Sequence, residues 1–385
     1  MSLRPPRRIL YVDHTAVMGG GEIALLQLVR NLDPARFTPT VALLSEGPLA
    51  EELTAANVRT ILIRAASELV EARRDKPPLS RSAAMPGAIA TILRIAKVVE
   101  QLGIELVHCN SLKADLLGGA AARLTRRPAI WHIRDRIETD YLPAASVRLL
   151  RCTANLLPAH IVANSFATLK TVRLLDESRG SVIYSGLDLE PYLQIPSRPI
   201  GSRPRIGIVG RLAPWKGQHI FLQAAALVRR QFPAATFQII GSPLFSETDY
   251  EKSLHNLAHS LGIESAVEFT GFRNDIPKVL DELDVVVHAS TTAEPFGQVA
   301  VLAMAAGKPL VATAGGGILE IVQDGKTGLL APLGDAGAMA MDIGALLSRP
   351  DWAAELGRAG RRRAAELFTI ERTARQIMEL YDRLV

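Results

Sequence analysis

Two cationic side chains and one carboxylate lie in loops that follow apolar runs, which predict strands. Their charges suggest that they belong to one binding site. Arg211 and Lys216 lie five residues apart in "IVGRLAPWKG", and Glu294 opens a Pro-Phe-Gly turn. Two cations beside a helix N-terminus suit a diphosphate, whose negative charge grows when a glycosidic or phosphoester bond breaks. A carboxylate near backbone amides accepts hydrogen bonds from hydroxyls. These residues therefore predict a site that binds a diphosphate and a sugar.

A plainer interpretation stays open for each of these residues. Arg and Lys in such a loop are often simply solvated, and Glu294 could act as an N-cap. Pro295 is well placed as an early helical residue. Gly297 would let the backbone amides of Phe296, Gly297 and Gln298 face a ligand, which an N-cap role does not explain.

A third loop, "HTAVMGGGEIALLQL", places three glycines between a predicted strand and its helix. Bare amides around Gly20 and Gly21 could approach an anion at the helix N-terminus. The loop lacks the Gly-Lys-Ser/Thr ending of a P-loop and the GxGxxG spacing of a dinucleotide fingerprint. Phosphate binding and a simple tight turn both remain open here.

The elements that must position these loops alternate regularly. Short β-branched or apolar runs are followed by longer helical patterns, first from "RILYVDH" and again from "PRIGIVGRL". This alternation predicts βαβ units and two parallel sheets, whose carboxyl ends hold the ligand loops. The segment between the two predicted sheets contains four prolines, which disfavour regular helix and strand: Pro191, Pro196, Pro199 and Pro204. The predicted helices cover residues 22–31, 86–102, 218–232, 249–261, 299–306 and 370–384.

Length and composition agree with two domains. The chain has 385 residues and is 48% hydrophobic, which is more than one ordinary core requires. Its two cysteines, Cys109 and Cys152, have no metal-binding spacing, which favours a reducing cytoplasm. No apolar run reaches the length of a signal or transmembrane segment. We expect residues 1–190 and 204–367 to form the two domains, with a linker at about 188–203.

The charge is uneven along the chain. Residues 1–190 contain 24 Lys and Arg against 19 Asp and Glu, which accounts for the whole net charge of +5. In the predicted helix 86–102, apolar residues repeat beside Arg94 and Lys97. The helix either packs on a sheet or lies on an anionic membrane surface. Nucleic acid is not expected, because aromatic residues make up only 5% of the chain.

Four motifs in order resemble those of the retaining glycosyltransferases of family 4. They are Gly-Gly-Gly-Glu near the start, "VGRLAPWKG", "EPFGQVAVLAMAAGKPLVAT" and "GGGILEIVQDGKTGLL". The resemblance covers nearly the whole chain. It implies the GT-B fold, an α/β architecture with two Rossmann-like, doubly wound parallel-sheet domains that face each other across a cleft. It also implies that a C-terminal helix, at about 368–385, crosses back onto the N-terminal domain.

The resemblance further implies a role for each matching residue. Domain 1–190 would bind the acceptor and domain 204–367 the nucleotide-sugar donor. His132, in "IWHIRD", resembles the histidine near the transferred sugar, although it could instead be a core histidine. The resemblance implies that the diphosphate of the donor is bound by Gly20, Gly21, Arg211 and Lys216. It implies that the sugar is bound by Glu294, Phe296, Gly297 and Gln298, and that the base is bound by Gly271 and Phe272.

The family transfers a sugar from a nucleoside diphosphate donor with retention and without a required bound metal or other cofactor. Retention by two inversions needs a carboxylate nucleophile under the anomeric carbon, and no residue is clearly in that position. We therefore favour front-face departure and attack, in which Arg211 and Lys216 stabilise the leaving diphosphate. A UDP-sugar is the favoured donor, with a GDP-sugar as the alternative.

One residue departs from the family's pattern. Leu302 stands eight residues after Glu294, where a second Glu usually accepts the hydroxyls of the donor ribose. Another group, such as Glu320 or a backbone carbonyl, could hold the ribose, or donor binding could be weaker. Alternatively, the protein is a catalytically weakened or inactive nucleotide-sugar-binding partner in a glycan assembly system. A nucleotide-sugar epimerase is disfavoured, because its usual carboxylate and histidine sites are not evident.

The predicted function is therefore transfer of a hexosyl unit to a glycan, lipid-linked or small-molecule acceptor, in polysaccharide or glycoconjugate biosynthesis. The polar, basic segment "ELVEARRDKPPLSRS" in residues 1–190 could meet a lipid-linked or phosphorylated acceptor, or could be solvated. We expect a cytoplasmic protein, with attachment to the inner face of the membrane as an open alternative.

Overall fold

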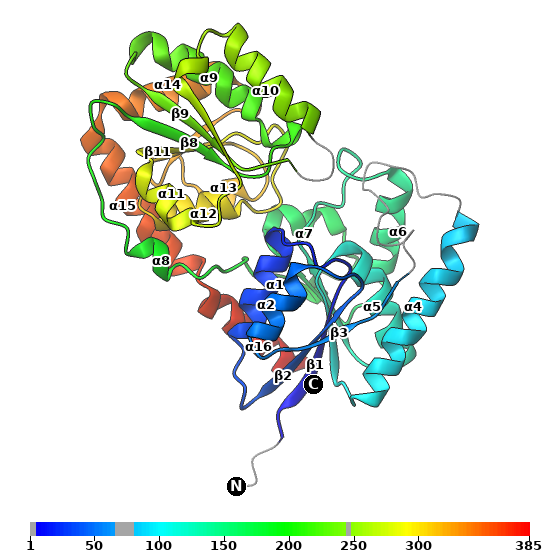
Figure 1. Cartoon of the computed structure of the whole chain (residues 1–385). Coiled ribbons are helices and arrows are strands. Elements are labelled where there is room, and N and C mark those ends of the chain that lie inside the picture. Colours follow the sequence, from blue (N-terminus) through cyan, green and yellow to red (C-terminus); the bar gives the residue numbers. More distant parts are fainter. Residues whose placement is uncertain (1–4, 66–80, 244–247) are drawn as a thin grey trace. The chain divides into compact units, whose positions relative to one another are not determined.

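The structure is a computed structural model that describes residues 5–65, 81–243 and 248–385. The chain divides into two compact units (Figure 1). Unit 1 consists of residues 1–187 and 370–385, and unit 2 consists of residues 188–369. Residues 68–80, which make up most of the polar basic segment, lie outside the described residues, so the predictions for that segment stay predictions.

Unit 1 contains a seven-stranded sheet in which all pairs of neighbouring strands are parallel. The strand order is β3-β2-β1-β4-β5-β6-β7, so the chain starts in the middle of the sheet and winds first to one edge and then to the other. The strands are β1 Arg7–Asp13, β2 Phe37–Leu43, β3 Arg59–Leu62, β4 Leu106–Cys109, β5 Ala129–Ile133, β6 His160–Ala163 and β7 Gly180–Val182.

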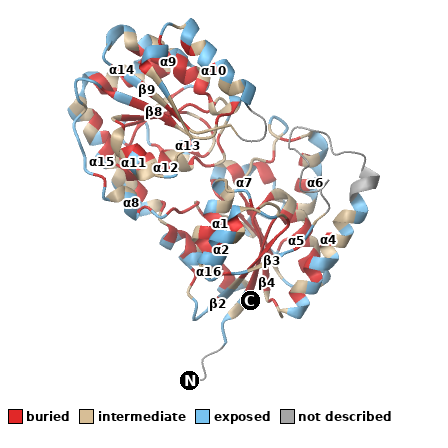
Figure 2. Cartoon of the chain, viewed as in Figure 1, coloured by how far each residue is buried: buried red, intermediate tan, exposed pale blue. Residues whose placement is uncertain are grey.

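Helices cover both faces of this sheet (Figure 1). Along β1, Ile9 and Tyr11 face the core that includes α1, α2 and α16, whereas Leu10 and Val12 face the core that includes α4 and α5. This alternation buries the strands on both sides (Figure 2). The helices are α1 Gly20–Arg30, α2 Pro48–Ala55, α4 Arg81–Gln101, α5 Leu112–Leu124, α6 Ala144–Ala154, α7 Phe166–Val172 and α16 Ile370–Leu384.

Unit 2 repeats the plan with a six-stranded parallel sheet of order β10-β9-β8-β11-β12-β13. The strands are β8 Arg205–Val209, β9 Thr236–Ile240, β10 Val267–Gly271, β11 Val285–His288, β12 Leu310–Thr313 and β13 Leu329–Ala331. The helices are α8 Glu190–Leu193, α9 Gln218–Gln231, α10 Thr248–Ser260, α11 Ile276–Glu282, α12 Gln298–Ala305, α13 Ile318–Ile321, α14 Ala336–Ser348 and α15 Pro350–Leu367.

Each of the six predicted helices is present within two residues of its predicted bounds, except that α4 starts at Arg81 rather than at residue 86; the helices that were not predicted include α2, α5, α6, α7, α14 and α15. Residues 188–203, predicted as a linker, belong to unit 2, where α8 contacts α12 and the carbonyl of Ile195 accepts a hydrogen bond from Arg361. The roles proposed for the two domains stay predictions. None of the helices that the structure describes is long and apolar enough to cross a membrane.

Candidate functional site

The carboxyl edge of the unit 2 sheet brings Lys216 and Glu294 together. Lys216 ends a 3₁₀ turn, Pro214–Lys216, that follows β8, and Glu294 lies in the loop after β11. Because β8 and β11 are neighbouring parallel strands, the loops that follow them meet at the same edge of the sheet. Residues 78 positions apart in sequence can therefore form one site.

Gly217 allows these two loops to touch. Its φ of 74° lies in the left-handed region, and a Cβ there would lie 1.9 Å from the carbonyl oxygen of Ala289. The amide of Thr291 donates a 2.8 Å hydrogen bond to the carbonyl of Trp215, which joins the turn to the loop after β11. A side chain at position 217 would therefore push Lys216 away from Glu294.

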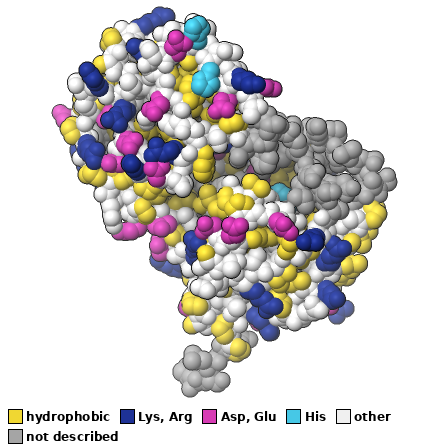
Figure 3. Space-filling model, in the orientation of Figure 1, with side chains coloured by type: hydrophobic (Ala, Val, Ile, Leu, Met, Phe, Trp, Pro, Cys, Tyr) yellow, Lys and Arg dark blue, Asp and Glu magenta, His cyan; other side chains and the backbone are white. Residues whose placement is uncertain are grey.

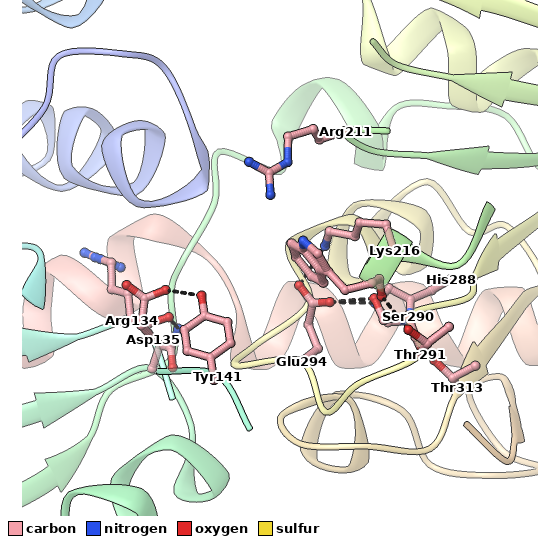
Figure 4. Close-up of polar contacts among 12 residues, drawn as sticks. Arg134, Asp135, Tyr141, Arg211, Lys216, His288, Ser290, Thr291, Glu294 and Thr313 are labelled. Carbon is pink, nitrogen blue, oxygen red and sulfur yellow. Dashed lines mark hydrogen bonds and ion pairs between the residues drawn. The ribbon is translucent and has the colours of Figure 1, made fainter. Parts of the chain in front are cut away.

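The Glu294 carboxylate is held at both oxygens (Figure 4). Lys216 Nζ lies 2.8 Å from Oε1, and the Ser290 hydroxyl donates a 2.7 Å hydrogen bond to Oε2. His288 Nε2 lies 3.4 Å from Oε2. Burial alone would raise the pKa of Glu294, which is only 8% exposed, but Lys216 and His288 hold that pKa well below its usual value. Glu294 is therefore an anion at neutral pH.

Trp215 lies beside both predicted cations. Lys216 Nζ is 4.3 Å from the centroid of the indole ring, and Arg211 Cζ is 5.7 Å from it. Cations over an indole face are attracted to its electron-rich surface. The aromatic ring therefore helps to fix the two positive charges at this edge of the sheet, a role that the sequence did not reveal.

The turn after Glu294 differs from the prediction. Helix α12 begins at Gln298, with Gly297 at its N-cap at φ 114°. Pro295 therefore precedes the helix, and Glu294 does not cap it, because its carboxylate is engaged by Lys216 and Ser290. The ring of Phe296 is buried against Phe368, with centroids 5.8 Å apart. This packing fixes the backbone whose amides were predicted to face a sugar.

The predicted base and ribose positions also lie in unit 2. Gly271 ends β10 with φ 69°, and the Phe272 side chain is 76% exposed. Leu302 is partly buried on α12, which contacts α13, the helix that carries Glu320. Arg363 donates a 2.7 Å hydrogen bond to the Glu320 carbonyl. How a ribose would be held here stays a prediction.

In unit 1 the predicted glycines lie at the start of α1. Gly20 and Gly21 are its first two residues, after Gly19 at the N-cap, which provides no side-chain cap. Asn110, just after β4, donates to the Gly21 carbonyl at 3.2 Å and to Asp13 Oδ2 at 2.7 Å. The glycine loop is thereby tied to the carboxyl ends of β1 and β4.

Arg134 is a cation at this edge that the sequence did not single out. It follows β5, and its Nε donates to Asn110 Oδ1 at 2.9 Å while Nη1 donates to Ser185 Oγ at 3.0 Å. Burial lowers its pKa to about 10, so it stays charged at neutral pH. The next residue, Asp135, accepts a 2.8 Å hydrogen bond from Tyr141 (Figure 4). Only the tertiary structure reveals the contacts of Arg134, because Asn110 and Ser185 lie in loops that are distant from it in sequence.

His132 is the one predicted catalytic residue whose side chain the structure buries completely. Its Nδ1 lies 3.1 Å from His108 Nε2 and 3.4 Å from Arg134 Nη2, and its Nε2 has no partner among the described residues. Burial and the Arg134 charge lower the pKa of His132 well below its usual value, so the ring is neutral. Its core position fits the plainer interpretation of this histidine, and a catalytic role stays untested.

Glu22, in the first turn of α1, carries an unusual carboxyl group. Burial, followed by the nearby Asp13 carboxylate, raises its pKa to about 7. Although acidic groups gather here, no group of three or more His, Cys, Asp or Glu side chains in the described residues is arranged to hold a metal ion.

The two parallel-sheet α/β units match solved structures of the GT-B class of glycosyltransferase folds, which confirms the predicted class of two doubly wound parallel-sheet domains. The family model described as Glycosyltransferase Family 4 matches residues 18–191, and that described as Glycosyl transferases group 1 matches residues 194–363. The chain therefore belongs to the glycosyltransferases that these two models describe, Glycosyltransferase Family 4 and Glycosyl transferases group 1.

Named relatives support this assignment. A D-inositol 3-phosphate glycosyltransferase of Frankia alni is 31% identical over 303 residues, covering 74% of this chain and 70% of the relative. A protein of the same name from Corynebacterium urealyticum is 35% identical over 222 residues, covering 54% of this chain and 52% of the relative. The crystal structure of HepE from Anabaena in complex with UDP-glucose has a TM-score of 0.84 and 28% identity, covering 98% of this chain and 100% of HepE.

Proposed function

We propose that the protein is a retaining hexosyltransferase that uses a nucleoside diphosphate sugar as donor. The observation that carries the proposal is the cluster of Lys216, Glu294 and Ser290 at the carboxyl edge of the unit 2 sheet, with Arg211 beside the same indole ring as Lys216. It combines two cations suited to a diphosphate with a carboxylate anion suited to sugar hydroxyls. The acceptor loops would be those of unit 1.

The residues favour a front-face reaction. A carboxylate nucleophile would have to lie unengaged under the anomeric carbon, whereas we assign the Glu294 carboxylate, whose Oε2 is held by Ser290, to accept the sugar hydroxyls. We propose instead that Arg211 and Lys216 stabilise the departing diphosphate, which accepts the proton of the attacking hydroxyl. The reaction needs no bound metal under this proposal, because the two cations neutralise the leaving group.

The relatives indicate which substrates to test first. HepE binds UDP-glucose, which favours a UDP-sugar donor over a GDP-sugar. Two relatives are named for D-inositol 3-phosphate, which adds a phosphorylated small molecule to the glycan and lipid-linked acceptors. We place the reaction in polysaccharide or glycoconjugate biosynthesis in the cytoplasm.

The α4 surface bears on the proposed contact with anionic lipid. Its inner face packs Ile95, Ala96 and Val99 into the core. Ile89 and Leu93, on the same helix as Arg94 and Lys97, are 52% and 55% exposed. Figure 3 shows hydrophobic side chains beside Lys and Arg along the flank of unit 1 where α4 lies in Figure 1. We propose that this face rests on the inner membrane surface.

The alternative is an inactive nucleotide-sugar-binding partner, which the Leu at position 302 keeps open. Calorimetry with UDP, GDP and a panel of their sugars tests binding, and donor hydrolysis and transfer assays test catalysis. We expect tight UDP binding and slow hydrolysis of one UDP-sugar with retention. Tight binding without hydrolysis or transfer to any acceptor would favour the partner protein, and no nucleotide binding would overturn both.

A further inference from the structure

We infer that Ser290 is a positioning residue that fixes which oxygen of Glu294 meets the donor sugar. The inference rests on the proposed function, since it assigns an orienting role within the same donor site. It concerns the two carboxylate oxygens separately: Oε2 is the anchored oxygen, and Oε1 is the oxygen that the sugar reaches.

The two oxygens have partners of different kinds. Oε2 accepts a hydrogen bond from the Ser290 hydroxyl, on a short side chain four residues away in the same loop. Oε1 is paired with Lys216 Nζ, at the end of a long side chain that is about one-fifth exposed. A four-carbon chain can swing its charge between partners, whereas a serine hydroxyl moves only through one torsion.

Ser290 is itself held in place. It is 1% exposed, and its carbonyl accepts a 2.8 Å hydrogen bond from the hydroxyl of Thr313 on β12. Its Oγ also lies 3.3 Å from Nε2 of His288, the last residue of β11, whose ring is close to the same oxygen of Glu294. The anchor of Oε2 is therefore tied to two neighbouring strands, β11 and β12.

A donor can exploit this asymmetry. When its diphosphate enters, Lys216 turns from Oε1 to the phosphate oxygens, which carry more negative charge. Oε1 is then free to accept a sugar hydroxyl, while Ser290 keeps Oε2 and the plane of the carboxylate unchanged. No covalent step is involved. Removing the Ser290 hydroxyl should weaken recognition of the sugar but leave the nucleotide contacts intact.

The test compares the binding of UDP-glucose with that of UDP by calorimetry, together with GDP-mannose and GDP. Ser290→Ala should weaken binding of the sugar nucleotide about three- to tenfold and change binding of the sugar-free nucleotide by less than about twofold, given the net value of one hydrogen bond. Ser290→Thr, which keeps a hydroxyl, should restore most of the loss. Lys216→Ala should weaken both kinds of ligand.

Thr327→Val is the matched control. Thr327 is another buried hydroxyl of unit 2, but its Oγ1 accepts a hydrogen bond from the backbone amide of Gln323, and none of its hydrogen bonds in the described part of the chain involves Glu294. We expect it to leave both affinities unchanged. Equal weakening of both ligands by Ser290→Ala, or no change in either, would overturn the positioning role while leaving the proposed function intact. A wild-type protein that binds no nucleotide would instead overturn the proposed function and this inference together.

Discussion

The hydroxyl of Tyr381 on α16 lies 2.5 Å from the hydroxyl of Tyr11 on β1 and 2.7 Å from Nδ1 of His108 on β4. Both tyrosines are fully buried. The contact joins the last helix of the chain to the first strand of unit 1, across 370 sequence positions. From Tyr381, a chain of polar contacts continues through His108 and His132 to the guanidinium of Arg134.

We predict that Tyr381→Phe lowers the free energy of unfolding of unit 1 by about 1–3 kcal/mol, because it leaves a buried hydroxyl and a histidine nitrogen without a partner. Urea denaturation followed by circular dichroism measures the change. The double variant Tyr11→Phe/Tyr381→Phe should cost less than the sum of the single variants, because it removes both hydroxyls. Strictly additive costs would show that the two hydroxyls are not coupled.

The carboxyl group of Glu22 predicts a pH-dependent stability. Its pKa rises from 4.5 to about 7 on folding, mainly through burial. Between these pH values the unfolded chain has lost the proton while the folded chain keeps it, so this group makes stability fall as pH rises through that window. Above about pH 7 its contribution is constant.

Glu22→Gln removes this titration. Between pH 5 and pH 8, the free energy of unfolding of the variant should rise relative to that of the wild type. We expect this rise to be smaller than about 3 kcal/mol, because the Glu22 side chain is partly exposed and solvent screens its interactions. Urea unfolding of both proteins at the two pH values gives the difference. Parallel stability profiles for the two proteins would contradict the raised pKa.

The sequence predicted the fold well because the fold depends on local patterns. Alternating strand and helix periods mark both sheets, and glycines with cations mark the loops at their carboxyl edges. Lys216 and Glu294 could be selected because a motif carries each of them. Ser290, Trp215 and Arg134 could not, because their significance comes from contacts between loops that are distant in sequence. A motif also selected His132, but no pattern could reveal that its ring is buried.

Substitutions of Lys216 and Glu294 should have different effects on UDP binding and on sugar transfer. Lys216→Ala removes a diphosphate cation, so we expect it to weaken UDP binding by at least about tenfold, the effect of losing one charge-assisted hydrogen bond. Glu294→Gln keeps the shape but removes the anion, so it should abolish transfer while UDP still binds. Calorimetry and a transfer assay separate the two effects, with thermal unfolding as the check on folding. Normal turnover in both variants would refute this assignment of the site.

The exposed face of α4 gives a test of membrane contact. Ile89→Gln/Leu93→Gln should reduce co-sedimentation with vesicles of 30% phosphatidylglycerol in phosphatidylcholine by about tenfold, since two large apolar side chains no longer enter the lipid. Leu124→Gln, on α5, is the control, because Leu124 is similarly exposed at 58% but lies on another helix. Equal binding by all three proteins, or none by the wild type, would exclude α4 as a membrane surface.

Leu302→Glu tests how the ribose is held. Leu302 is partly buried on α12, where the family's pattern has a second carboxylate, and a leucine cannot accept a hydrogen bond. If the ribose has no other acceptor, the new carboxylate should tighten UDP binding by about tenfold or more, the value of one charge-assisted hydrogen bond. Leu302→Gln, which accepts without charge, should improve binding less. Weaker UDP binding by Leu302→Glu, with thermal stability unchanged, would mean that the pocket has been rebuilt around the leucine and that another group holds the ribose.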